Sequence, residues 1–394
     1  MKDMGLSKKR KVRSSFCGVA FLLFAVYLLT FSVGAAETKG ENALGNVPEA
    51  YVLLVDELDG KVLENLPEKL HSSDVDELGE AVGEMATPEF FFSFIRECLG
   101  IGLDDALTLF ATLSGILVLS ALFNTFKGTF FGEGATALNI CSSAAIFGCV
   151  ISLEAEHFSR VEEFFGGIGV IMNGLIPSVS IIYAMGGNVS TAFASSGTLY
   201  IFLAFCEEVC RVSVLPVAAV TTAFSLCGSI SPSARLVGLS SAVKKSYTFI
   251  LGLIMTLLLS VLSAETLLTS AADTVSARAA KLVASNVIPI VGSSVGDTVR
   301  TLSSSIGYLK SVCGVGGIIF ILLLVLPVVI RLLLARAAFL FATAVADLVG
   351  CEAQGRLIGE LGSVYGILLA VVSMCSVMFI LAITVFLRCG IALG

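Results

Sequence analysis

The sequence is poor in charged residues, which make up 14% of its 394 residues, whereas hydrophobic residues make up 56%. Soluble domains average roughly a quarter charged residues. The deficit, together with a mean hydropathy of +0.96, excludes an ordinary soluble domain as the main body. It predicts a polytopic membrane protein. The sequence also lacks a basic stripe interleaved with aromatic residues, so nothing in it supports nucleic-acid binding.

Groups that carry catalysis are equally scarce. The only two histidines are His71 and His157, and the motifs HExxH, GxSxG and GxxxxGK[ST] are absent. Without a phosphate-binding loop, this chain cannot drive itself with ATP. We therefore expect no enzyme activity, no catalytic residues and no cofactor.

The eleven cysteines are scattered and lie mostly within apolar runs, and no CxxC is present. Cys206 and Cys210 share a helical face, but no histidine lies near them and a second ligand pair is missing. We interpret the cysteines as small buried hydrophobes rather than as a metal site or a disulfide framework.

The N-terminus has the pattern of a targeting segment. Five basic residues between Lys8 and Arg13 precede an apolar run over 16–33, followed by the small residues "GAA". This predicts a signal peptide at 1–35, cleaved after Ala35. The alternative is an uncleaved membrane anchor, since the run is just long enough to span a bilayer. In both cases the next residues emerge outside the cytoplasm.

Residues 36–104 form the only long stretch with a soluble composition. Within 37–90, fourteen acidic residues stand against three lysines. We expect an acidic extracytoplasmic segment of short amphipathic helices, which serves as a solvated lead-in or as a surface for a partner. Its end, "PEFFFSFIRECLGIGL", is typical of an interfacial helix approaching the bilayer.

The membrane body begins with a predicted two-helix segment at 105–164, whose acidic end, 154–163, is expected to be an external loop. Lys127 and Lys244–Lys245 favour cytoplasmic loops, because short cytoplasmic loops are enriched in lysine and arginine. The apolar runs together predict six to nine crossings or partial crossings. They lie at 106–126, 136–153, 166–184, 190–206, 212–230, 248–264, 312–334, 337–346 and 363–387.

Three short motifs recur in the same order at nearly constant spacing. "LIPSV" around Pro177 matches "VIPIV" around Pro289, "LPV" recurs around Pro216 and Pro327, and "RLVG" at 235–238 matches "RLIG" at 356–359. The pattern predicts two homologous halves, 165–276 and 277–394. The expected fold is all-α: a polytopic helical membrane protein with two internal repeat halves that contain Pro-broken helices.

Interrupted apolar segments at matching places in two halves indicate a transport pathway in repeat-built transporters. The alternative is a pair of ordinary kinked helices without a pathway. The candidate pathway or broken-helix residues are Asn173, Pro177, Pro216, Asn286, Pro289 and Pro327. Charged residues inside membrane segments are functional candidates by default, and the clearest of these are Glu207, Glu208 and Arg211.

The stretch from "NGLIPSVSIIYAMGG" to "ASNVIPIVGSSVGDTVRTLSSSIGYLKSVCGVGGIIFILLLVLPVVIRLL" resembles the stage III sporulation protein AE family, most specifically between Pro289 and Pro327. The resemblance implies an endospore-forming bacterium and a multi-pass protein of the mother-cell membrane that surrounds the forespore. It implies membership of a channel complex that joins the two cells. Its implied partners are a secretion-type ATPase and ring-forming proteins. The family offers no established catalytic residues to carry over.

Three functions therefore stay open at this point. The first is a membrane subunit of the sporulation channel complex, in the form of a permease-like pore. The second is a free-standing secondary transporter that uses its two halves for alternating access. The third is a membrane scaffold that holds partners through the acidic segment.

Overall fold

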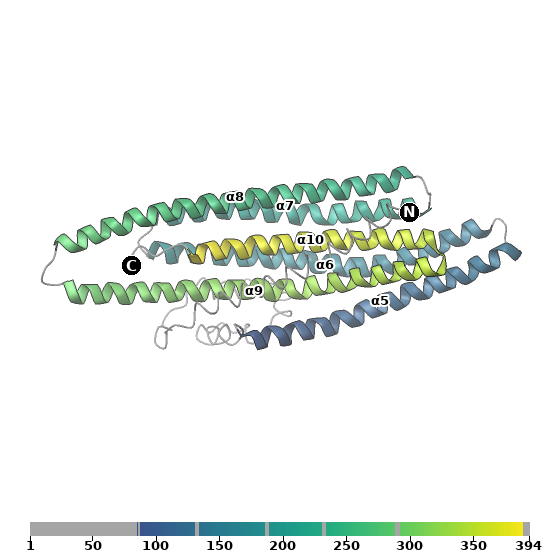
Figure 1. The fold of residues 1–394 in the computed structure, drawn as a ribbon, viewed down its shortest axis with the longest axis horizontal. Coiled ribbons are helices and arrows are strands. Elements are labelled where there is room, and N and C mark those ends of the chain that lie inside the picture. Colours follow the sequence, from purple (N-terminus) through teal and green to yellow (C-terminus); the bar gives the residue numbers. More distant parts are fainter. Residues whose placement is uncertain are drawn as a thin grey trace.

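Six long helices packed side by side make up the described part of the computed structural model of the chain (Figure 1). The structure describes Met85 and residues 87–130, 134–185, 189–230, 234–287 and 292–388. The helices are α5 (Pro88–Phe130), α6 (Gly134–Met185), α7 (Val189–Ile230), α8 (Ala234–Val287), α9 (Gly292–Val349) and α10 (Glu352–Arg388). No strand occurs in these residues, so the predicted all-helical fold is confirmed there. The predicted signal peptide lies outside the described residues, as does the acidic segment up to Glu84.

Successive helices run in opposite directions along the bundle (Figure 1). α5, α7 and α9 end, and α6, α8 and α10 begin, at the end of the bundle that holds Cys351, which we name the Cys351 end. Lys127 and Lys244 both lie in the parts of their helices nearer this end, as expected for residues on the same side of a membrane.

A tight turn joins α9 to α10 at the Cys351 end. Gly350 has φ of 77°, a left-handed conformation that glycine adopts without steric cost. The amide of Cys351 donates to the carbonyl of Ala346 at 2.9 Å, the six-to-one hydrogen bond of a Schellman C-cap. The sequence "VGC" therefore stops α9 and reverses the chain into α10.

α9 and α10 form the centre of the bundle. Of their most apolar parts, 78% and 67% are buried inside the protein, against 25–33% for the other four helices. The two helices approach closely where α10 carries glycine. A Cβ on Gly362 would lie 2.9 Å from Cβ of Phe339, and one on Gly355 would lie 3.0 Å from Cβ of Ala346. Small residues at helix contacts are the usual device for close packing in membrane proteins.

All six described helices are long and apolar enough to cross a membrane. This number agrees with the lower limit of the six to nine crossings predicted from the sequence. A crossing needs only about 20 residues, whereas these helices have 37 to 58. Several predicted segments are therefore parts of one helix. The predicted interfacial helix at 88–103 is the first part of α5, and the runs at 190–206 and 212–230 are both in α7.

The prediction of an external loop at 154–163 is wrong, because this segment lies inside α6. Helical spacing explains why its charges do not interrupt the helix. Arg160 donates to Glu156 one turn earlier at 2.8 Å, and Ser159 contacts Glu163 at 3.2 Å. Meanwhile His157, Val161 and Phe164 are buried on one face, which is the i, i+4, i+7 pattern of an amphipathic helix.

The helices also continue without a break through two of the candidate broken-helix prolines. Pro216 lies inside α7 and Pro327 inside α9. A proline inside a helix removes one backbone hydrogen bond, and neighbouring helices and hydroxyl groups compensate for such losses in membrane proteins. Near Pro216, Ser213 donates to the carbonyl of Val209 at 2.5 Å and contacts the hydroxyl of Tyr247 on α8 at 2.8 Å.

Two of the three matched motif pairs fall in two consecutive helical hairpins, α7–α8 and α9–α10, whereas Pro177 of the remaining pair lies within α6 and Pro289 lies outside the described residues. Pro216 and Pro327 lie in the first helix of each hairpin, and "RLVG" and "RLIG" lie near the start of the second. Both hairpins run in the same direction in Figure 1. If the halves are homologous, they are therefore parallel rather than inverted repeats. The proposed boundaries at residues 165 and 277 fall within α6 and α8.

An ion pair joins α8 to the central helices. Nζ of Lys244 lies 2.5 Å from Oε2 of Glu360 on α10, and it also donates to the hydroxyl of Ser363. The side chain of Lys244 is 13% exposed. The neighbouring Lys245 is exposed.

We expect Lys244→Ala to lower the free energy of unfolding by about 2 kcal/mol, because hydrogen bonds to charged groups contribute about 1.5–3 kcal/mol and Glu360 is left without its cation. Lys245→Ala is the matched control and should stay within about 0.5 kcal/mol of the wild type, as surface substitutions do. Thermal unfolding of the purified protein in detergent measures both. Equal shifts in the two variants would contradict a role for the contact with Glu360.

Candidate functional site

Charged side chains meet about midway along the bundle, at the crossing of three helices. Nη1 of Arg331 on α9 lies 3.8 Å from Oδ2 of Asp105 on α5 and 3.9 Å from Oε1 of Glu156 on α6. We name Asp105, Glu156, Arg160 and Arg331 the Arg331 cluster. The arginine side chain is only 16% exposed, whereas the carboxylates are 48% and 56% exposed. The cluster therefore reaches from the side of the bundle into its interior.

A glycine on α5 makes room for Arg331. A Cβ on Gly102 would lie 3.0 Å from Cδ1 of Leu334 and 3.5 Å from Cγ of Arg331. The absence of a side chain lets α5 lie directly against the aliphatic stem of the arginine. The guanidinium group is then held beside Asp105, one turn further along α5.

Arg160 completes the cluster from α6. Its Nη2 and Nε donate to the same oxygen of Glu156, Oε1, at 2.8 and 3.2 Å. Glu156 is therefore shared between an arginine of its own helix and Arg331 of α9.

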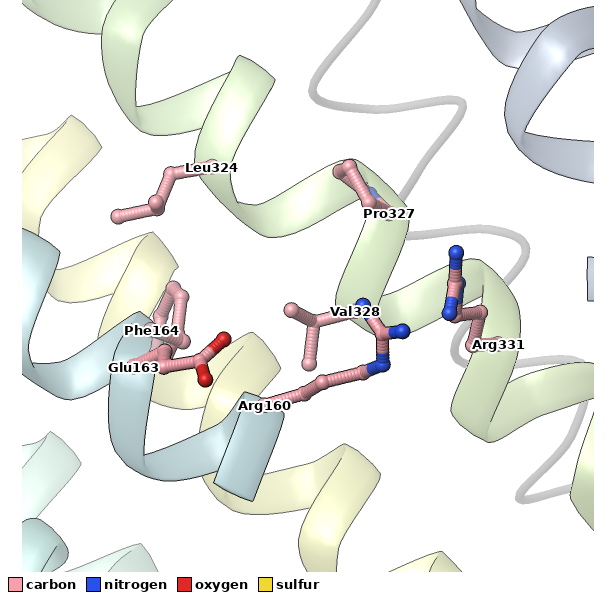
Figure 2. A pocket seen from close by; sticks show the side chains of 7 residues that line it. All are labelled: Arg160, Glu163, Phe164, Leu324, Pro327, Val328 and Arg331. Atoms are coloured by element: carbon pink, nitrogen blue, oxygen red, sulfur yellow. The ribbon is translucent and has the colours of Figure 1, made fainter. Parts of the chain in front are cut away.

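A pocket of about 390 Å³, part of it open to the outside, lies between α6 and α9 beside this cluster. Figure 2 shows its lining. Arg160, Glu163 and Phe164 come from α6, and Leu324, Pro327, Val328 and Arg331 come from α9. One predicted pathway residue, Pro327, thus lines the same pocket as two arginines and a glutamate. Pro327 also lacks the backbone N–H that would donate to the carbonyl of residue 323. This carbonyl leaves α9 more polar here than its sequence indicates.

A smaller pocket of about 210 Å³ lies on another side of Arg331. It is lined by Gly102, Asp105, Ala106, Leu109, His157, Arg331 and Ala335. His157 is buried and packs edge-on against Tyr365 of α10, with ring centroids 5.4 Å apart. Arg331 therefore borders both pockets, whose linings are mainly apolar.

The three predicted intramembrane charges lie together on α7. Arg211 contacts Glu208 at 2.6 Å and Glu207 at 3.7 Å. Glu207 is buried, whereas Glu208 and Arg211 are exposed. A pocket of about 470 Å³ lies between α6 and α7, and Arg211 and Glu162 both line it. These charges form a second polar group, and α6 lies between it and the Arg331 cluster.

The other predicted pathway residues do not join these sites in the described part of the chain. Pro216 is exposed on α7. Asn173 and Pro177 fall within the bounds of α6 and Asn286 within those of α8, but their side chains are outside the description, as is Pro289 altogether. Nothing in the structure tests a role for these four residues.

None of the residues of the Arg331 cluster was a candidate site residue in the sequence. Glu156 and Arg160 belong to the segment 154–163, which was predicted to be an external loop, and Asp105 and Arg331 were not singled out. Two signals could have found them: the four-residue spacing of Glu156 and Arg160, and the place of Arg331 inside a long apolar run. Among the described residues, no group of three His, Cys, Asp or Glu side chains is arranged to bind a metal.

Comparison with known proteins identifies the family. The family model described as Stage III sporulation protein AE matches residues 75–390, which include all six described helices. No curated protein and no solved structure matches the chain. The match covers the resemblance noted in the sequence and extends it over the whole helical bundle. This helical protein, with six helices fit to span a membrane, belongs to the stage III sporulation protein AE family, and its role is in sporulation.

Proposed function

We propose that the protein is a permease-like pore subunit of the channel complex that joins the mother cell to the forespore during endospore formation. The observation that carries the pore role is the Arg331 cluster. It places two arginines, two carboxylates and two pockets at the crossing of α5, α6 and α9.

The cost of such a cluster favours a pathway over a scaffold. A charged side chain in the middle of a membrane helix costs about 2.5–3.5 kcal/mol on insertion scales. Apolar residues would join α5, α6 and α9 without this cost. Intramembrane charges are retained mainly where they line ion or solute pathways, and here they border pockets rather than packed core.

The partners that we propose supply the energy source that this chain lacks. It has no phosphate-binding loop, so active transport through this subunit requires another source of energy. We propose a secretion-type ATPase on the cytoplasmic side of the mother-cell membrane and ring-forming proteins on the forespore side as its partners. In this arrangement the protein is not an enzyme. The part of the acidic segment that precedes α5, residues 36–87, faces the space between the two cells.

Purification from sporulating cells tests the complex. We expect the tagged, full-length protein, extracted in mild detergent, to bring down an ATPase and at least one ring-forming protein. It should do so only after the forespore has been engulfed. A variant lacking residues 37–84 should remain in the membrane and lose the ring-forming protein.

The control is the same tagged protein produced in vegetative cells, which should bring down neither partner. Recovery of the protein alone from sporulating cells would contradict the complex. If the isolated protein in vesicles then moved a solute along its gradient, the free-standing transporter would be the better assignment.

A further inference from the structure

An exposed apolar stripe with one positive charge runs along α5. Phe92, Arg96, Leu103 and Leu107 lie about three, four or seven residues apart, so they share one face of the helix, about 150° around it from the buried Cys98. Phe92 and Leu107 are 68% and 54% exposed. Glu97 lies about 100° around the helix from Arg96, off this stripe, and the exposed Glu89 lies on the same face beyond Phe92, about 10 Å along the helix from Arg96.

A similar stripe with a negative charge runs along α7. Ile201, Phe205, Glu208 and Val212 share a face and are all exposed, and Ile201 is 70% exposed. The surroundings of Glu208 are net negative, because Glu207, Glu208 and Glu162 stand against Arg211. Arg211 donates twice to Oε2 of Glu208, which leaves Oε1 available for a second cation.

The two charges lie at the same depth in the bundle. Asp105 and Glu156 are level, since both contact Arg331. Arg96 is nine residues before Asp105, about 14 Å further from the Cys351 end. On α6, Glu162 is about 9 Å beyond Glu156 in the same direction, and it shares a pocket with Arg211. Glu208 is one turn beyond Arg211, which adds about 4.5 Å and brings it level with Arg96.

The two stripes cannot meet within one copy of the chain. α5 packs against α9 and α6, whereas α7 packs against α6, α10 and α8. Figure 1 shows α5 along one side of the bundle and α7 with α8 along the other. A contact between α5 and α7 therefore requires two copies, and it uses a different surface on each.

We propose that a second copy of this chain docks its α5 stripe on the α7 stripe of the first, with Arg96 of one copy paired to Glu208 of the next. The charges match in sign and depth, and large apolar side chains flank both. Because the two surfaces differ, the contact is head-to-tail, and repeated copies form a ring if the rotation closes. This contact is independent of the proposed pore role and extends beyond it.

Co-purification of two differently tagged full-length copies tests the contact. Wild-type copies should retain each other in detergent. When both copies carry Arg96→Glu, the meeting surfaces are both negative, and when both carry Glu208→Arg, both are positive. We expect each variant to lose at least about tenfold of the co-purified copy, since like charges facing each other cost several kcal/mol.

The decisive arm mixes the two variants. A copy with Arg96→Glu meets a copy with Glu208→Arg as opposite charges at both kinds of contact, so co-purification should return to near the wild-type level. That recovery also shows that both variants fold. Lys245→Glu, an exposed charge reversal on α8, is the matched control and should change nothing.

Two results would overturn the proposal. One is that either single variant pairs with itself as well as the wild type does. The other is that both single variants lose the contact and their mixture does not restore it. A symmetric contact of α5 with α5 gives a different pattern, because Arg96→Glu then replaces one like-charged pair with another and no loss occurs.

Discussion

Gly362→Leu is expected to prevent the protein from accumulating in the membrane. Gly362 lies on α10 where it meets α9, and even a Cβ there would come within 2.9 Å of Cβ of Phe339. Real Cβ atoms do not approach so closely, and the obstructing atom is next to the backbone of α9 rather than at the end of a flexible side chain. The two central helices would have to separate. Inserting extra methylene groups into a well-packed core costs about 1–3 kcal/mol and occasionally more. Leucine adds four carbon atoms.

Gly252→Leu is the matched control. Gly252 lies in the middle of α8, and a Cβ there meets nothing within 4 Å. Both substitutions give the same increase in helix propensity, about 1 kcal/mol relative to glycine, so they differ only in the space around the site. Membrane fractions probed by immunoblot should contain the control at the wild-type level and Gly362→Leu at a small fraction of it. Equal amounts of the two variants would contradict the close packing of α9 on α10.

The apolar runs of the sequence are enough to predict a helical membrane bundle. Runs such as 312–334 and 363–387 are too apolar for any other setting, and they become α9 and α10, the two most buried helices. The match of the family model to residues 75–390 confirms the family that the two Pro-containing stretches indicated. Both successes rest on long segments, in which many residues give the same signal.

The ends of the helices were harder to predict, for a physical reason. A run of glutamates such as 154–163 is costly in lipid, and from sequence alone it marks the end of a span. In the bundle Glu156 meets both Arg160 and Arg331, so part of the cost is removed and α6 continues. Proline was also misleading, because α7 and α9 continue through Pro216 and Pro327.

The candidate site depends on contacts that no local pattern contains. Asp105 and Arg331 are far apart in the sequence and lie on helices that meet only when the bundle is complete. Sequence reasoning therefore found Pro327, through its repeated motif, and missed the charged side chains that share its pocket. The α7 charges Glu207, Glu208 and Arg211 were found because their ion pairs are local.

Arg331→Gln is expected to have the largest effect on spore formation among substitutions outside the packed core. It removes the only cation that links α9 to Asp105 and Glu156 among the described residues, and it leaves two partly exposed carboxylates beside a neutral side chain. Breaking a buried pair costs about 3–5 kcal/mol, and the exposure of the carboxylates lowers this to about 2 kcal/mol. A loss of this size reduces abundance several-fold in cells. Arg356→Gln, on the exposed face of α10, is the control and should have no effect.

A neutral version of the cluster separates stability from transport. Arg331→Gln and Arg160→Gln combined with Asp105→Asn and Glu156→Gln remove both cations together with both carboxylates, so no uncompensated charge of the cluster remains between α5, α6 and α9. We expect this quadruple variant to recover the abundance and thermal stability of the wild type, because replacing a buried ionic group as a whole is often neutral. We also expect heat-resistant spores to remain as rare as in Arg331→Gln alone. Spore counts that return together with protein abundance would mean that the cluster only joins the helices, and the scaffold would then be the better assignment.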